Sequence, residues 1–179
     1  MKYFEQIKKS MNWLGKQKNT VFIGQAVEVP GTAMYSTLNE SVDKNKLYEL
    51  PVAEEMQMGM TLGLSLLGKT PISIYPRWNF LLCAINQLVN HIDKFPQMAP
   101  NWPKENIIIR TSIGSERPLF PQHQHVGDFT SGISKMCSNI VIKKLEEPED
   151  ILPCYIEAYN AKKGSVYIIV EYGDYYNEK

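Results

Sequence analysis

The sequence predicts a single α/β domain built on a doubly wound, mostly parallel sheet of about six strands, with helices on both faces. Three observations support this fold class. Short apolar segments alternate with longer segments whose apolar residues recur at helical spacing. The short segments hold few polar residues, which is typical of strands covered on both faces. The 179 residues have the length of one domain, and no linker or internal repeat divides them.

The predicted strands are runs of β-branched or aromatic residues that end at turn signals. In chain order they cover residues 20–23, 47–50, 71–75, 106–110, 139–142 and 166–170. The clearest is the fourth, Asn-Ile-Ile-Ile-Arg. Ligands of such sheets bind beyond the carboxyl ends of the strands, so the loops that follow these segments are the candidate ligand loops.

The predicted helices show apolar residues at three- and four-residue intervals and end at glycine or proline. They cover residues 3–15, 33–42, 53–67, 79–95 and 148–161, with a further helix that starts near Asp128. The helix over 53–67 is rich in Met and Leu and stops at Gly68. Pro96 and Pro100 end the helix over 79–95, because proline cannot continue a helical ladder.

Composition excludes several classes of function. The formal net charge is +0, so no basic footprint indicates a nucleic acid partner. The three cysteines are far apart and lack the spacing of a zinc site or a disulfide framework. No apolar run approaches the ~20 residues of a membrane span. We therefore expect a cytoplasmic protein that binds neither membrane nor nucleic acid.

Glu54 is the first candidate for chemistry, because it follows a strand and Pro51 and opens an apolar helix. A carboxylate there can simply stabilise the helix dipole by about 0.3–1 kcal/mol, a role that Glu55 could share. A carboxylate at the ligand edge beside apolar side chains also needs a polar partner, which favours a functional role. Gly59 and Gly63 lie four residues apart on this helix and indicate close approach of another helix or backbone, with packing inside the domain as the alternative.

Two further loops carry candidate residues. His123 and His125 follow the fourth strand, and no third ligand lies at a convincing metal-binding spacing. We interpret them as proton donors or anion contacts, or else as surface histidines.

The loop after the third strand holds Tyr75, Arg77, Trp78 and Phe80. Its aromatic side chains suit stacking on a flat heteroaromatic ring, or else they belong to the core. Arg77 suits an anionic substrate.

The segment Leu50-Pro-Val-Ala-Glu54-Glu-Met-Gln-Met-Gly59-Met-Thr-Leu-Gly63 resembles the pyrimidine-domain signature of transketolase-like thiamine diphosphate enzymes. It is most similar to the beta subunits of 2-oxoacid dehydrogenases. The next strand, aromatic loop and helix are also similar, Gln122-His123-Gln124 falls where the family carries a loop histidine, and the last strand ends in Glu171. The resemblance covers nearly the whole chain, and the segment around Glu54 is its most specific part.

This resemblance implies one pyrimidine-binding domain over residues 1–179. Glu54 would hydrogen-bond a ring nitrogen of the aminopyrimidine and so activate the cofactor, which decarboxylates a 2-oxo acid or transfers a ketol or aldehyde unit. The substrate would be a small anionic carbonyl compound. The implied cofactor contacts are Glu54, Tyr75, Trp78 and Phe80, the implied catalytic residues Glu54, His123 and His125, and the implied substrate contacts Arg77, His123 and Gln25.

The sequence departs from the family in ways that predict a partner. The family binds the diphosphate through Mg²⁺ at a Gly-Asp-Gly motif in a separate domain, and this sequence has no such motif. It also lacks the carboxy-terminal domain of the beta subunits. A diphosphate-binding partner subunit carrying Gly-Asp-Gly would complete the site, in a heterodimer or an α2β2 heterotetramer.

Gln25 and Ala26 stand where the family often has acidic residues, which keeps open a non-catalytic binding or regulatory module. An unrelated flavodoxin-like domain is the third hypothesis.

Overall fold

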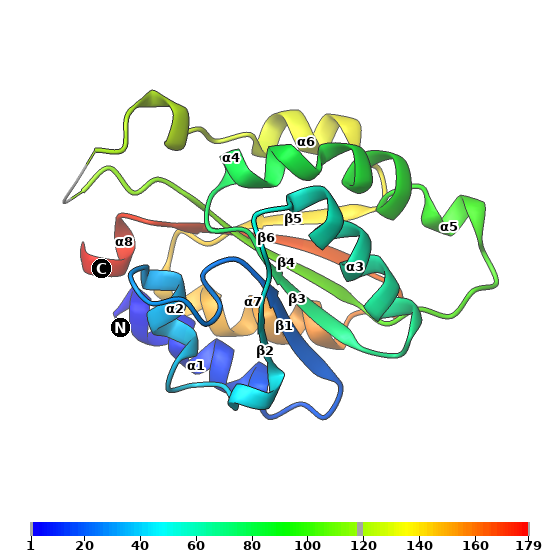
Figure 1. Cartoon of the computed structure of the whole chain (residues 1–179), viewed down its shortest axis with the longest axis horizontal. Helices are drawn as coiled ribbons and strands as arrows, with labels where there is room; N and C mark the ends of the chain where they lie inside the picture. The colour runs from blue at the N-terminus through cyan, green and yellow to red at the C-terminus, as the bar shows by residue number, and fades with distance from the viewer. Residues whose placement is uncertain (1, 118–119, 179) are drawn as a thin grey trace.

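The computed structural model describes residues 2–117 and 120–178. Its six strands form one wholly parallel sheet in the order β2-β1-β3-β4-β6-β5 (Figure 1). The strands are β1 (Thr20–Gly24), β2 (Leu47–Glu49), β3 (Thr70–Ile74), β4 (Ile107–Ile113), β5 (Ile140–Lys144) and β6 (Val166–Tyr172). The predicted fold class is confirmed.

Helices cover both faces of the sheet (Figure 1). One face carries α1 (Tyr3–Gly15), α2 (Ala33–Leu38), α7 (Pro148–Asn160) and the short α8 (Tyr175–Glu178). The other carries α3 (Glu54–Leu66), α4 (Trp78–Leu81) and α6 (Thr130–Met136), and α5 (Phe95–Met98) lies at one end of the molecule. No helix in the described part of the chain is long and apolar enough to cross a membrane.

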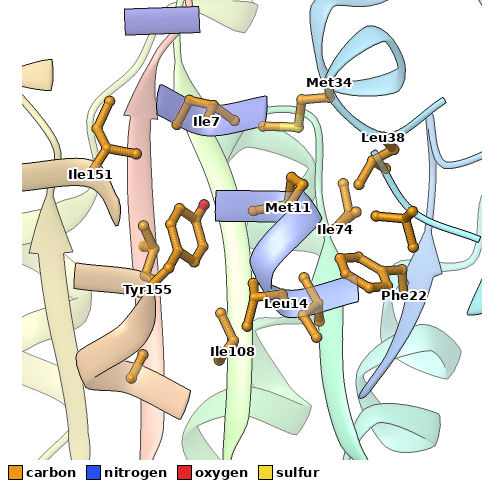
Figure 2. Close-up of a cluster of buried hydrophobic side chains, with 14 of the residues drawn as sticks. Ile7, Met11, Leu14, Phe22, Met34, Leu38, Ile74, Ile108, Ile151 and Tyr155 are labelled. Carbon is orange, nitrogen blue, oxygen red and sulfur yellow. The ribbon is translucent and has the colours of Figure 1, made fainter. Parts of the chain in front are cut away.

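Strand side chains alternate between two hydrophobic clusters, as the two-residue period of a strand requires. On β4, Ile108 belongs to the cluster under α1 and α7, whereas Ile107 and Ile109 belong to the opposite cluster. Figure 2 shows Ile7, Met11 and Leu14 of α1 with Ile108 and other residues of the first cluster. Their spacing of three to four residues gives α1 one apolar face, which is why this segment lies flat on the sheet.

A buried ion pair joins the carboxyl ends of β4 and β6 on the α1 and α7 face. Arg110 donates from Nε to Glu171 Oε1 at 2.6 Å and from Nη2 to Oε2 at 2.9 Å, and neither side chain is exposed. The Glu171 carboxylate also accepts the hydroxyl groups of Tyr155 and Tyr176. Every charge in the cluster is therefore hydrogen-bonded, as burial demands.

Two predicted helices differ from the structure. The helix over 33–42 ends at Leu38, where the amides of Ser41 and Val42 both bond the Leu38 carbonyl and turn the chain. The helix over 79–95 is broken into α4, a 3-10 turn (Leu82–Ala84) and a π-helix (Gln87–Ile92) before α5. Apolar spacing does not distinguish the wider π turn from an α turn, so the sequence pattern indicated one continuous helix.

Candidate functional site

The strand order reverses between β1 and β3, and this reversal positions the candidate site. From β1 the chain moves outward to β2, whereas from β3 it moves the other way to β4. The loops beyond the carboxyl ends of β1 and β3 therefore diverge, and open α/β sheets bind their ligands at such a switch point. Gln25 follows β1, Tyr75 follows β3, and α3 begins at Glu54 a short turn after β2. Three predicted site residues thus meet at this point.

Glu54 is held by one neighbour from each adjacent loop. Its carboxylate Oε1 accepts a hydrogen bond from Gln25 Nε2 at 3.1 Å, and its main-chain oxygen accepts one from the Tyr75 hydroxyl at 3.2 Å. The residue is 9% exposed, and within the described ranges its Oε2 has no hydrogen-bond donor and its carboxylate no ion pair. One carboxylate oxygen is thus fixed and the other is available to a ligand.

Tyr75 supports the start of α3 as a neutral hydrogen-bond donor. Its side chain is fully buried. Burial raises the pKa of its hydroxyl well above the ordinary value, and the nearby Glu54 carboxylate acts in the same direction. The proton that Tyr75 shares with the Glu54 carbonyl therefore stays in place at any physiological pH.

Gly24 lets the strands and α3 approach closely behind Glu54. Its φ is +137°, and a Cβ there would lie 2.2 Å from the Ile74 oxygen and 2.6 Å from Gln57 Nε2. Gln57, one turn after Glu54, uses that space to donate to the Ile74 oxygen at 2.9 Å and to Ser73 Oγ at 3.1 Å. Glycine at this position thus allows α3 to be bonded directly to the end of β3.

Glu49 is a positioning residue that the sequence analysis missed. Its carboxylate accepts the backbone N–H groups of Ala26 at 3.0 Å, Val27 at 2.6 Å and Glu28 at 2.7 Å. Ala26 has φ +58°, a conformation that a non-glycine residue adopts only when its surroundings enforce it. The carboxylate thus fixes the loop that carries Gln25. The only sequence signal was an acid at the end of the second strand.

Arg77, Phe80 and His125 form a second group. Arg77 Nη1 donates to the main-chain oxygen of His125 at 2.9 Å, and the rings of Phe80 and His125 lie 5.7 Å apart. Burial lowers the pKa of Arg77, an effect that the Asp174 carboxylate opposes. Among the described residues, no hydrogen bond or ion pair links this group to Glu54.

The remaining predicted residues lie outside these two groups. His123 is exposed and contacts Phe120 edge to face at 5.4 Å. Trp78 is fully buried in the core cluster on the side of the sheet that α3 and α4 cover, and its Nε1 finds no hydrogen-bond partner in the described part of the chain. Of the three predicted aromatic contacts, Tyr75 and Trp78 belong to the interior, and Phe80 is only partly buried.

A cleft opens beside Arg77 at the same edge of the sheet. Its volume is about 510 Å³, and its lining includes Thr32, Arg77, Ser112, Ser115 and Tyr176, but not Glu54. Ser112 lies on β4, so the cleft continues along the carboxyl edge from the switch point. No three His, Cys, Asp or Glu side chains among the described residues gather as metal ligands.

A solved structure has a similar fold. A structure named "Split gene transketolase, inactive beta4 tetramer" matches 94% of this chain with a TM-score of 0.71 and 16% sequence identity. The chain has a transketolase-like fold. It covers 50% of the length of that solved chain. No family model and no curated protein matches the sequence.

The transketolase-like domain leaves one face of α3 uncovered. A Cβ at Gly59 or Gly63 would meet no atom of residues 2–117 or 120–178 within 4 Å, so packing within this part of the chain does not account for these glycines. Met56 and Met60 on the same helix are 46% and 41% exposed, and Leu67 at its end is 81% exposed. We call these five residues the α3 face. It begins at Met56, two residues after Glu54.

Proposed function

We propose that this chain is the pyrimidine-binding subunit of a split thiamine diphosphate-dependent enzyme that decarboxylates a 2-oxo acid or transfers a ketol or aldehyde unit. The observation that carries the proposal is Glu54: a nearly buried carboxylate at the switch point, with Oε1 bound by Gln25 and Oε2 available. The signature around Glu54 and the transketolase-like fold support the same assignment.

The residues around Glu54 fit an aminopyrimidine. A buried carboxylate needs hydrogen-bond donors, and among the described residues Glu54 receives only the one from Gln25 at its carboxylate. A protonated ring nitrogen would supply a second, charge-assisted bond to Oε2. When bound, thiamine diphosphate supplies the electron sink for cleavage next to a carbonyl. Glu54 would hold the proton at the ring nitrogen, Gln25 would orient the carboxylate, and Phe80 is the predicted aromatic contact left partly exposed.

The cleft beside Arg77 would receive the substrate. Its guanidinium is anchored by main-chain oxygens and brings a positive charge to the lining, with Ser112 and Ser115 as neutral hydrogen-bonding groups. This combination suits the carboxylate or phosphate of a small anionic carbonyl compound. His125 borders Arg77 and Phe80, so we assign it to substrate contact, and the exposed His123 to the outer part of the loop.

A partner subunit would bind the diphosphate and Mg²⁺, because the sequence has no Gly-Asp-Gly motif. The α3 face is its proposed docking surface: two glycines permit a close helix crossing, and the flanking methionines and Leu67 supply apolar contact. The similar split-gene transketolase is named an inactive tetramer of beta subunits, which supports the expectation that one component alone lacks activity. The complete enzyme would be a heterodimer or a heterotetramer.

A non-catalytic module with the same fold is the second candidate, and the Gln25–Glu54 bond favours it. An amide, not an acid, faces Glu54, and its N–H occupies one oxygen of the carboxylate. In that case the chain would assemble with a partner without binding the cofactor.

Co-purification with a Gly-Asp-Gly-bearing partner, followed by calorimetric titration of thiamine diphosphate and Mg²⁺, tests the proposal. We expect cofactor binding and 2-oxo acid or ketose turnover only in the complex. Glu54→Gln should lower turnover by at least a hundredfold. Glu55→Gln is the matched control, since Glu55 is exposed and, among the described residues, its carboxylate accepts a hydrogen bond only from the surface residue Asn86. Full turnover in Glu54→Gln would refute the assignment, and assembly without cofactor binding would favour the second candidate.

A further inference from the structure

A second pocket lies at the amino edge of the sheet, opposite the Glu54 edge. The irregular segment before β4 and the turn before β6 enclose a volume of about 550 Å³. One wall is apolar and aromatic, with Phe95, Pro96 and Trp102. Lys104 lines the pocket next to this wall.

The Lys104 ammonium is buried, and no carboxylate among the described residues forms an ion pair with it. Its Nζ is shielded from solvent and finds no hydrogen-bond acceptor in the described part of the chain. It lies 5.4 Å from the centre of the Phe95 ring, a cation–π contact that satisfies none of its N–H groups. Burial lowers the pKa of this lysine, and no carboxylate offsets the effect. An ammonium in this setting is costly until an anion joins it.

The other charges of the lining are also mostly positive. Lys162 and Lys163 stand in the turn before β6, and Glu105 is the one acid among the described lining residues. The Glu105 carboxylate is already bound by Lys163 Nζ at 2.6 Å. The pocket therefore offers net positive charge at Lys104 and Lys162.

We propose that this pocket binds a small organic anion, a phosphate ester or a carboxylate with a flat apolar body. The anionic oxygens would accept hydrogen bonds from Lys104 Nζ, which has no acceptor among the described residues. The apolar body of the ligand would lie against Phe95, Pro96 and Trp102. A covalent role for Lys104 is less well supported, because the described lining holds no histidine or free acid to move protons. The pocket is at the opposite edge from Glu54, so it is independent of the proposed cofactor site.

Calorimetric titration of the full chain with phenyl phosphate, benzoate and inorganic phosphate tests the proposal. We expect saturable binding of phenyl phosphate or benzoate. Lys104→Met should weaken it at least tenfold, whereas Lys135→Met, at an exposed position on α6, should change it less than twofold. Trp102→Ala should weaken phenyl phosphate more than inorganic phosphate, since only the former has a body to contact the wall. Stronger binding of phenyl phosphate than of benzoate identifies a phosphate site, and the reverse order a carboxylate site.

Amide chemical-shift mapping of the unsubstituted chain keeps the proposal testable if Lys104→Met does not fold. Phenyl phosphate or benzoate should shift the amides of residues 102–105 and 162–165. Three outcomes would overturn the proposal: no saturable binding of any probe, equal binding in Lys104→Met, or shifts confined to other parts of the chain. Glu54→Gln should bind the same probes with unchanged affinity, because Glu54 lies at the opposite edge of the sheet. Probe binding therefore tests this pocket independently of the cofactor role proposed for Glu54.

Discussion

Gln25 in the loop after β1 and Glu54 at the start of α3 share a hydrogen bond of 3.1 Å at the point where the sheet reverses its strand order. The amide is the donor and a Glu54 carboxylate oxygen is the acceptor, so the bond fixes the orientation of the Glu54 side chain. It also determines that Oε1 is the Glu54 carboxylate oxygen already bonded within the chain. The chemistry that we propose for Glu54 depends on this arrangement, because only Oε2 is left for a ligand.

Gln25→Glu should destabilise the chain. It replaces the donor by a second carboxylate next to Glu54, and two like charges ~4 Å apart repel by about 1–4 kcal/mol at effective dielectric constants between water and a protein surface. Urea unfolding at pH 7.5 measures the loss. Gln97→Glu, at an exposed position, is the control and should cost little. Equal stability of both variants would show that the Gln25–Glu54 bond does not constrain the site.

Glu49→Gln should loosen the loop after β1. The carboxylate accepts several backbone N–H groups, and an amide cannot accept them all, so we expect a loss of roughly 1–3 kcal/mol in the free energy of unfolding. Hydrogen exchange at the Val27 and Glu28 amides should accelerate. Glu28→Gln, at an exposed position in the same loop, keeps an oxygen that can accept the Glu49 N–H and should leave exchange at Val27 unchanged. Unaltered exchange in Glu49→Gln would contradict the role assigned to Glu49.

The free energy of unfolding at alkaline pH should depend on the raised pKa of the buried Tyr155. Burial and the Glu171 carboxylate raise its pKa well above the ordinary value of about 10. Above that pH the unfolded chain has lost the proton and the folded chain keeps it, so this group contributes stability that falls as pH rises. The slope is about −1.4 kcal/mol per pH unit. Between pH 10 and 11, where the unfolded tyrosine is still losing its proton, Tyr155→Phe should make the pH dependence shallower by about 1 kcal/mol. Parallel profiles for the two proteins would contradict this account.

Gly59→Ala and Gly63→Ala should each stabilise the isolated chain and each weaken its assembly with the partner subunit. Neither new methyl group comes within 4 Å of an atom in the described part of the chain, and alanine favours a helix over glycine by about 1 kcal/mol, so the isolated chain should become more stable. The same methyl groups would hold a partner helix away and weaken assembly. Thermal melting and analytical ultracentrifugation with the partner measure the two effects. Gly24→Ala is the contrasting variant and should destabilise, since its Cβ would overlap the Ile74 oxygen. Unimpaired assembly of the α3 variants would exclude the α3 face as the docking surface.

The central strands β1, β3, β4 and β6 were predictable because a buried parallel strand needs a continuous apolar run. The bounds of each predicted strand, including the edge strands β2 and β5, lie within three residues of those observed. The location of Glu54 was predictable for a related reason. Once strand and helix alternate, a residue that opens the helix after a strand must lie at the carboxyl edge. Its chemical role remains a prediction.

Other features depend on pairing between distant segments, and local patterns do not encode them. Glu49 bonds the loop after β1 only because β1 and β2 are neighbours in the sheet. Trp78 resembled a ligand contact by its place in a loop, but α4 turns its ring into the core. No sequence motif marks Lys104. That its ammonium has no hydrogen-bond acceptor among the described residues follows only from the folded position of the segment before β4.

The exchange rate of the proton on the thiazolium carbon between its nitrogen and sulfur tests the central claim most directly. It is measured by hydrogen–deuterium exchange on thiamine diphosphate bound to the complex with the partner subunit, for the unsubstituted chain, Glu54→Gln and Glu55→Gln. We predict fast exchange in the unsubstituted and Glu55→Gln complexes, and exchange at least a hundredfold slower in Glu54→Gln while the cofactor stays bound. Equal exchange in all three complexes would contradict the assignment of Glu54 as the activating carboxylate.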